Sequence, residues 1–236
     1  MIRVLIFNEF IEEKTRENVK AVYPNGIHEC LREALCEEFE VKTVTQDDEN
    51  CGITKEVLDN TDVLLWWAHA GHTTVPDEVA DLVHDAVLRG MGAIFLHSSH
   101  YAKPFKKLMG TSCSLHWRED GDFERVWVIN PAHPIAQGIG EYLYIEHEET
   151  YGEPFDIPQP DQEVFIGAYE GGEVFRSGCC FLRGNGKVFY FQPGHETFPV
   201  YYNEQVRKVL RNAVRWCYNS YRIPEITCPH VTKPQD

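Results

Sequence analysis

Short apolar segments alternate with amphipathic segments through the first hundred residues, and this alternation constrains the fold more than any other feature. The apolar segments, at residues 3–7, 41–45, 62–68 and 92–96, are typical of strands buried on both faces. Apolar residues at helical spacing predict helices over residues 27–39, 54–59 and 76–89. A long loop is expected between the first strand and Pro24. The alternation predicts βαβ units, and hence a parallel sheet with right-handed crossovers.

The second half of the chain has a different pattern, in which strands follow one another. Strands are predicted at residues 123–129, 142–145 and 164–169. Residues 179–183 and 187–191 flank Gly184-Asn185-Gly186 as an antiparallel hairpin, and a last helix is predicted over residues 203–218. We therefore expect a single α/β domain over residues 1–222, with a mainly parallel sheet and an antiparallel hairpin extension. Prolines predict an irregular C-terminal tail over residues 223–236.

Composition narrows the classes of partner. The 22 Lys and Arg residues against 37 Asp and Glu residues give a formal net charge of -15, which would repel a nucleic acid backbone. The longest apolar runs are far shorter than the roughly 20 residues that cross a bilayer. No export signal is recognised and the eight cysteines form no C-x-x-C pair, so we expect a reduced, cytoplasmic protein. No nucleic acid and no membrane is expected as a partner.

Histidines gather at the predicted strand ends. The ends of parallel strands share one edge of the sheet, where open α/β folds bind their ligands. Seven of the eleven histidines follow strands or open the adjoining helix: His28, His69, His72, His97, His100, His147 and His195. The alternative is that exposed loops simply collect polar residues. We favour a ligand site, because loops on a rigid scaffold often carry function.

Two chemistries suit this set of residues. Two imidazoles with a carboxylate such as Glu149 would hold a divalent transition metal such as zinc and leave a position open for water or a carbonyl oxygen. General acid–base catalysis needs only one histidine and one carboxylate near the substrate. The sequence does not choose between them.

Other reactive or aromatic residues favour structural roles. Cys179 and Cys180 lie inside an apolar strand, which indicates packing. Ser98 lacks the flanking glycines of a hydrolase elbow. Trp66 is expected in the core, whereas Trp117 lies in a polar loop and could stack on a sugar face.

Several motifs together resemble the trehalose utilisation, or ThuA-like, family. They span nearly the whole chain in order: GIH at 26–28, GMGAIFLHSSH at 90–100, LMGTSC at 108–113, HPI at 133–135, EETYGEPF at 148–155, GGEVFRSGCCF at 171–181 and GKVFYFQPGHET at 186–197. The resemblance implies a flavodoxin-like three-layer sandwich related to class I glutamine amidotransferases. It also implies a role in sugar metabolism, on trehalose-like disaccharides or their 3-keto derivatives, together with a separate dehydrogenase.

The family's motif positions fall on particular residues of this chain. Its histidines match His28, His97 and His195, and its acidic motif matches residues 148–151. These three histidines are also the candidate metal ligands. His97 stands where the amidotransferase relatives have their cysteine nucleophile, so glutamine hydrolysis is not expected.

The leading hypothesis is an enzyme that hydrolyses a sugar or keto-sugar or eliminates a group from it. Glu149 would act as base or acid, and His97 and His195 would polarise or protonate the reacting oxygen. The residues expected to bind the small-molecule sugar are His28, His69, His100, Trp117, Arg118 and Tyr151. The alternatives are a non-catalytic sugar-binding or metabolite-binding regulatory domain and, third, an amidotransferase-like cysteine enzyme. Self-association into a homo-oligomer is expected only because many soluble α/β domains self-associate.

Overall fold

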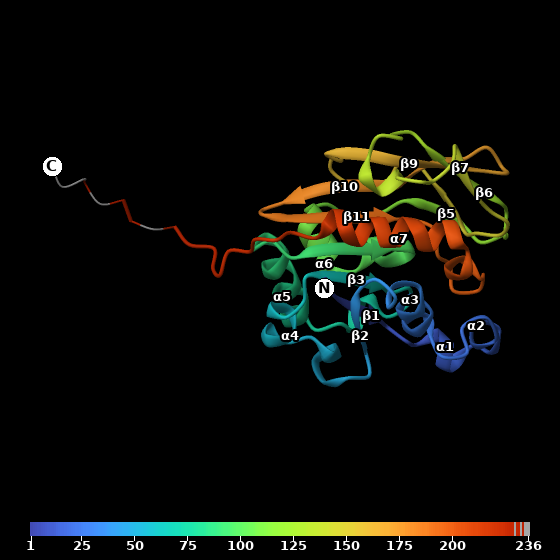
Figure 1. The fold of residues 1–236 in the computed structure, drawn as a ribbon. Helices are drawn as coiled ribbons and strands as arrows, with labels where there is room; N and C mark the ends of the chain where they lie inside the picture. The colour runs from blue at the N-terminus through green and yellow to red at the C-terminus, as the bar shows by residue number, and fades with distance from the viewer. Residues whose placement is uncertain (229, 232, 234–236) are drawn as a thin grey trace.

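A nine-stranded sheet runs through the molecule in the order β2-β1-β3-β4-β11-β10-β9-β6-β7 (Figure 1). The computed structural model describes residues 1–228, 230, 231 and 233. The strands are β1 (Arg3–Asn8), β2 (Glu40–Thr45), β3 (Val63–Trp67), β4 (Gly92–Leu96), β6 (Glu124–Val128), β7 (Tyr142–Ile145), β9 (Gln162–Tyr169), β10 (Val174–Arg183) and β11 (Gly186–Phe191). A separate two-stranded sheet pairs β5 (His116–Arg118) with β8 (Thr150–Gly152).

Five neighbouring strands, from β2 to β11, run parallel. Every residue of β3 and of β4 is buried, which explains why these strands read as continuous apolar runs rather than as alternating ones. The expected hairpin is confirmed: β10 pairs antiparallel with β11, and Arg183 lies opposite Gly186. The remaining strands β9, β6 and β7 extend the sheet antiparallel beyond β10.

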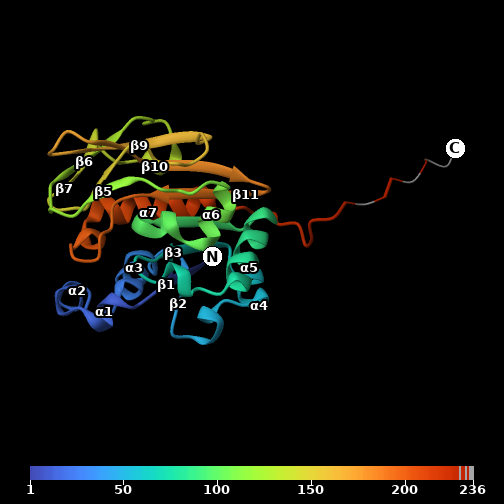
Figure 2. The ribbon, with the colours of Figure 1, turned by 180° about the vertical axis from the view of Figure 1, so that it is seen from behind.

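Helices cover both faces of the parallel strands and make three layers (Figures 1 and 2). The helices α3 (Ile27–Leu35) and α7 (Glu204–Cys217) contribute to one hydrophobic core. The helices α4 (Lys55–Asp59), α5 (Asp77–Leu88) and α6 (Lys103–Met109) contribute to the other. Two buried neighbours show the division, because Trp67 packs in the first core and Trp66 in the second. The predicted mainly parallel α/β sandwich is confirmed.

Some elements differ from the sequence prediction. The prediction of a long loop after β1 is wrong, because this segment holds two helices, α1 (Glu12–Thr15) and α2 (Glu17–Val22). Helices this short and this polar show no apolar periodicity. α6, β5 and β8 were not expected either, since each is short. The 3-10 turns are Glu49–Gly52, His72–Thr74, His97–Tyr101, Pro134–Ala136 and Val200–Tyr202.

The chain beyond α7 carries no helix or strand in its described part. Its start is attached to the body, because the backbone N–H of Ile223 donates to the carbonyl oxygen of Arg89 over 3.0 Å. The described residues from there to Cys228 extend away from the body (Figure 1). Positions 229, 232 and 234–236 of the predicted tail lie outside the described residues. Among the described helices, none has the length and apolar character that crossing a bilayer requires.

Candidate functional site

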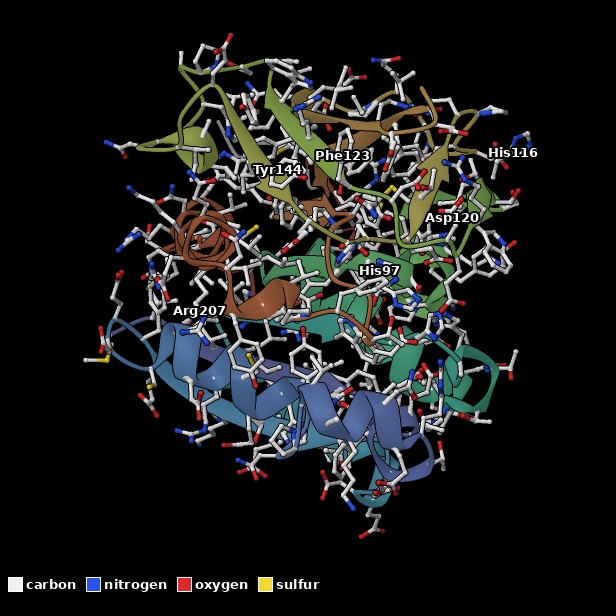
Figure 3. The ribbon with its side chains drawn as sticks, turned by 90° about the vertical axis from the view of Figure 1, so that its right-hand side faces the viewer. His97, His116, Asp120, Phe123, Tyr144 and Arg207 are labelled. Atoms are coloured by element: carbon white, nitrogen blue, oxygen red, sulfur yellow. The ribbon has the colours of Figure 1, made fainter. Side chains whose placement is uncertain are left out.

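Three adjacent parallel strands deliver three histidines to the same place. His97 follows β4 directly, His69 comes two residues after β3, and His195 comes four residues after β11. These strands are neighbours in the sheet, so the side chains that follow them must lie close together. Figure 3 shows His97 near the middle of the molecule, and this side chain is fully buried.

The three histidines and Glu149 form one compact cluster. Their candidate ligand atoms all lie within 4.8 Å of one another. The Nε2 of His97 lies 3.2 Å from Oε2 of Glu149, yet both atoms are buried without a hydrogen-bond partner. Because a buried polar atom without a partner costs free energy, this pair indicates a site that something else completes.

His97 is held with its Nε2 free. Its Nδ1 lies 3.0 Å from the carbonyl oxygen of Gln192. A carbonyl only accepts, so Nδ1 carries the proton and Nε2 keeps its lone pair. Burial, with the neighbouring His69 charge, lowers the pKa of His97 to about 3. Its backbone φ of 50° is a conformation that costs a non-glycine residue about 1–3 kcal/mol and is found mainly at functional sites.

His69 is oriented by two carboxylates. Its Nδ1 lies 2.5 Å from Oε2 of Glu12 and 3.6 Å from Oε2 of Glu196, so Nδ1 donates to these carboxylates and Nε2 is the ring nitrogen that remains for the cluster. Arg16 pairs with both carboxylates, at 2.6 Å and 3.1 Å. Burial alone would lower the pKa of His69, but the Glu12 hydrogen bond and the Glu196 charge raise it to about 9.

His195 carries its proton on the other ring nitrogen. Its Nδ1 accepts from the backbone N–H of Thr197 over 3.3 Å and lies 2.8 Å from the hydroxyl of that residue. The proton of the neutral ring is therefore on Nε2. This atom lies 3.8 Å from Oε1 of Glu119. Burial and the neighbouring His97 lower the pKa of His195 to about 3.

A pocket of about 340 Å³ opens beside the cluster. It is lined by His69, His72, Ser98, His100, Tyr101, Leu115, Trp117, Glu119, Glu149 and Tyr151. The Tyr151 hydroxyl lies 3.0 Å from that of Ser98, and its ring stacks on His97 at 5.4 Å. Trp117 is 65% exposed, so a flat face is open to a ligand. The volume suits a small polar molecule.

The structure brings most, not all, of the expected residues together. His69, His97, His195 and Glu149 form the cluster, and His100, Trp117 and Tyr151 line the pocket. His28 is in neither set: its Nδ1 lies 3.0 Å from Nδ2 of Asn8, beneath the loops. Arg118 is bound by Asp120, Asp122 and Glu173 and does not line this pocket.

Carboxylates hold the histidine loops, and sequence reasoning missed Glu9 and Glu12 among them, whereas Glu148 belongs to the acidic motif at residues 148–151. Glu9 accepts from the backbone N–H groups of Ala70 and Gly71, each over 2.7 Å. Glu148 accepts from the N–H groups of Gly194 over 2.8 Å and His195 over 3.1 Å. Glu9 directly follows β1, so the strand-end argument would have found it. Glu12 lies in an unpredicted helix and gave no signal.

A mainly parallel sheet whose carboxyl edge carries a polar cluster is typical of a flavodoxin-like α/β domain. The sequence model of the ThuA protein family, described as trehalose utilisation, matches residues 3–217 of the chain. The chain belongs to this family.

Solved structures support the fold. A ThuA-like protein from Bacteroides uniformis has a TM-score of 0.68 at 16% identity, with 94% of each chain covered. One from Parabacteroides merdae has a TM-score of 0.65 at 14% identity, with 95% of this chain and 92% of that chain covered. A glutamine amidotransferase from Thermotoga maritima has a TM-score of 0.53 at 13% identity, with 92% and 97% covered. No curated protein sequence matches the chain.

Proposed function

We propose that this protein is a metal-assisted enzyme that acts on a sugar or keto-sugar by hydrolysis or elimination. The observation that carries the proposal is the buried, unpartnered pair of His97 Nε2 and Glu149 Oε2 inside a cluster of histidines. The description of the family as trehalose utilisation supports a sugar as the substrate class.

The donor set fits a divalent transition metal such as zinc. His69 and His97 each donate Nδ1–H to an oxygen, as metal-binding histidines do. The Nε2 of His97 keeps its lone pair, whereas His69, with its pKa raised to about 9, would release its Nε2 proton when a metal binds. Two imidazoles and the Glu149 carboxylate make three ligands, which is the number typical of a catalytic site with an open position. His195, protonated at Nε2, is the weakest ligand of the four. A bound metal would supply a Lewis acid for a substrate oxygen.

The other pocket residues would hold the sugar. Trp117 would stack on an apolar sugar face, because its ring is exposed at the pocket. The Tyr151 and Ser98 hydroxyls and His100 would hydrogen-bond sugar hydroxyls. His195 would donate its Nε2–H to an oxygen on which negative charge develops. His97 and Glu149, as ligands, would fix that oxygen rather than exchange protons with it.

Elemental analysis of the purified protein tests the metal. We expect about one transition metal ion per chain in the wild type, and less than a tenth of that in His97→Ala and Glu149→Gln. His195→Ala should keep its metal. His84→Ala, on the outer part of α5, is the matched control. A wild-type protein that takes up no metal when zinc, manganese or iron is supplied would refute the metal centre.

Turnover of a 3-keto-disaccharide tests the reaction. The metal-loaded wild type should release product, and chelation should abolish the activity until metal is restored. His195→Ala should bind metal normally but turn over at least 100-fold more slowly. If calorimetry shows sugar binding by the metal-loaded protein without product after prolonged incubation, the protein is a binding domain and the enzymatic proposal fails.

A further inference from the structure

Glu119 is the second carboxylate of the pocket, and the metal ligand set does not use it. Its side chain is 47% exposed and its Oε1 lies 3.8 Å from Nε2 of His195. It lines the same pocket as Glu149 and Trp117. None of the described residues donates a hydrogen bond to its carboxylate. The Glu119 carboxylate is therefore within reach of a bound ligand, with both of its oxygens available to accept hydrogen bonds.

The backbone that carries Glu119 is firmly attached. Arg118, the preceding residue, is held by Asp120, Asp122 and Glu173. The carbonyl oxygen of Asp122 accepts from the backbone N–H of Glu148 over 2.9 Å. Figure 3 labels His116, the first residue of β5, and Asp120, the residue that follows Glu119. Of the three carboxylates between β5 and β6, Asp120 and Asp122 pair with Arg118, and Glu119 is the one that lines the pocket.

Glu119 also complements His195. Because Thr197 N–H donates to Nδ1, the Nε2–H of His195 faces the Glu119 side of the pocket. A donor and an acceptor therefore lie opposite each other at 3.8 Å, a separation that a ligand atom or a small side-chain rotation can close. Catalytic hydrogen bonds are often this long before substrate binds.

We propose that Glu119 is the general base of this site and that His195 is its electrophilic partner. This inference rests on the proposed function and extends it to substrates with a C–H bond next to a carbonyl. Glu119 takes the proton from that carbon, and the electron pair of the broken C–H bond forms the enolate double bond. The carbonyl oxygen gains the negative charge and accepts the hydrogen bond from His195 Nε2–H. The proton returns to carbon, or a leaving group departs from the next carbon.

Hydrogen–deuterium exchange into a methyl 3-keto-glucoside measures this step without requiring turnover. In D₂O, the metal-loaded wild type should exchange the hydrogens on the carbons next to the keto group, as followed by NMR. Glu119→Gln should exchange at least 100-fold more slowly, with unchanged metal content. Formate should restore part of the exchange in Glu119→Ala, because it replaces the missing carboxylate.

Glu170→Gln is the control, because Glu170 is an exposed carboxylate in the turn after β9 and does not line the pocket. Its exchange rate should stay within threefold of the wild type. Wild-type exchange rates in Glu119→Gln would overturn the role of Glu119. A wild type that binds metal but exchanges no hydrogen would overturn it too, while leaving the metal centre intact. Absence of metal would instead defeat the proposed function.

Discussion

Glu12 and His69 form a partly buried pair through Nδ1 of the imidazole ring. The 2.5 Å contact fixes the imidazole ring and its proton on Nδ1, so Nε2 is presented to the cluster. His69 and Arg16 together lower the pKa of Glu12 to about 2, against the effect of its burial. The carboxylate is therefore charged at all ordinary pH values, and it increases the basicity of the ring it binds.

Replacing Glu12 tests this indirect role. Glu12→Gln should weaken metal affinity about 10–100-fold, the usual effect of removing a carboxylate behind a metal-binding histidine. Competition with a chromophoric chelator measures the affinity. Glu17→Gln, an exposed residue at the start of α2, should leave it unchanged. Equal affinities for wild type and Glu12→Gln would mean that His69 does not bind the metal.

Glu124 should make stability depend on pH. It is fully buried, Oε1 accepts from the Ser177 hydroxyl over 3.0 Å, and Oε2 has no partner. Burial raises its pKa from 4.5 to about 8. Between these values the folded state binds one more proton than the unfolded state, so this group makes stability fall as pH rises from about 4.5 to 8. Glu124→Gln should remove that loss, which is on the order of a few kcal/mol at pH 9.

Urea unfolding at pH 5 and at pH 9 measures the effect. The gain of Glu124→Gln over the wild type should be larger at pH 9 than at pH 5. Glu170→Gln, an exposed residue in the turn after β9, provides the comparison and should follow the wild type at both values. A gain that does not change with pH would show that Glu124 is not protonated in the folded protein.

Among the elements, α7 contributes the most continuous apolar stripe. Its buried residues are Val206, Val209, Leu210, Ala213, Val214 and Cys217. The Asn203 side chain caps the helix by accepting from the backbone N–H of Gln205 over 2.9 Å. Leu210→Ala should lower the free energy of unfolding by about 2–5 kcal/mol, because it leaves a cavity in the core. Denaturant unfolding measures this loss. The control is Gln205→Ala on the exposed face of the helix, which should change the free energy of unfolding by less than about 0.5 kcal/mol.

The elements with strong periodicity were the ones that could be predicted. The spacing of apolar residues located α5 and α7 within a few residues, and the strand-end rule located His69, His97 and His195. The same reasoning could not exclude His28, because a sequence does not say whether a side chain at the start of α3 points into the pocket or, as here, toward Asn8. Short elements such as α1 could not be predicted, since four residues are too few to show a helical spacing of apolar residues.

At the scale of the whole molecule, the site is assembled from distant parts of the chain. The helix α1 supplies Glu12, the ends of β3 and β4 supply two histidines, and the segments before β8 and after β11 supply Glu149 and His195. Sequence separations of this size mean that the cluster exists only when the sheet and the antiparallel extension have both formed. An unfolded chain would hold these residues far apart and bind metal weakly, so binding of the proposed metal would be coupled to folding.

This coupling predicts a metal-dependent melting temperature. At a free metal concentration 100 times its Kd, a ligand that binds only the folded state adds about 2.7 kcal/mol, or roughly 5–10 °C for a chain of this size. Scanning calorimetry of chelated and metal-loaded wild type should show this rise. His97→Ala should show almost none, because its ligand set is incomplete. His84→Ala should rise like the wild type. Equal increases in wild type and His97→Ala would place the stabilising metal elsewhere on the molecule, since only the cluster between β3, β4 and β11 depends on His97.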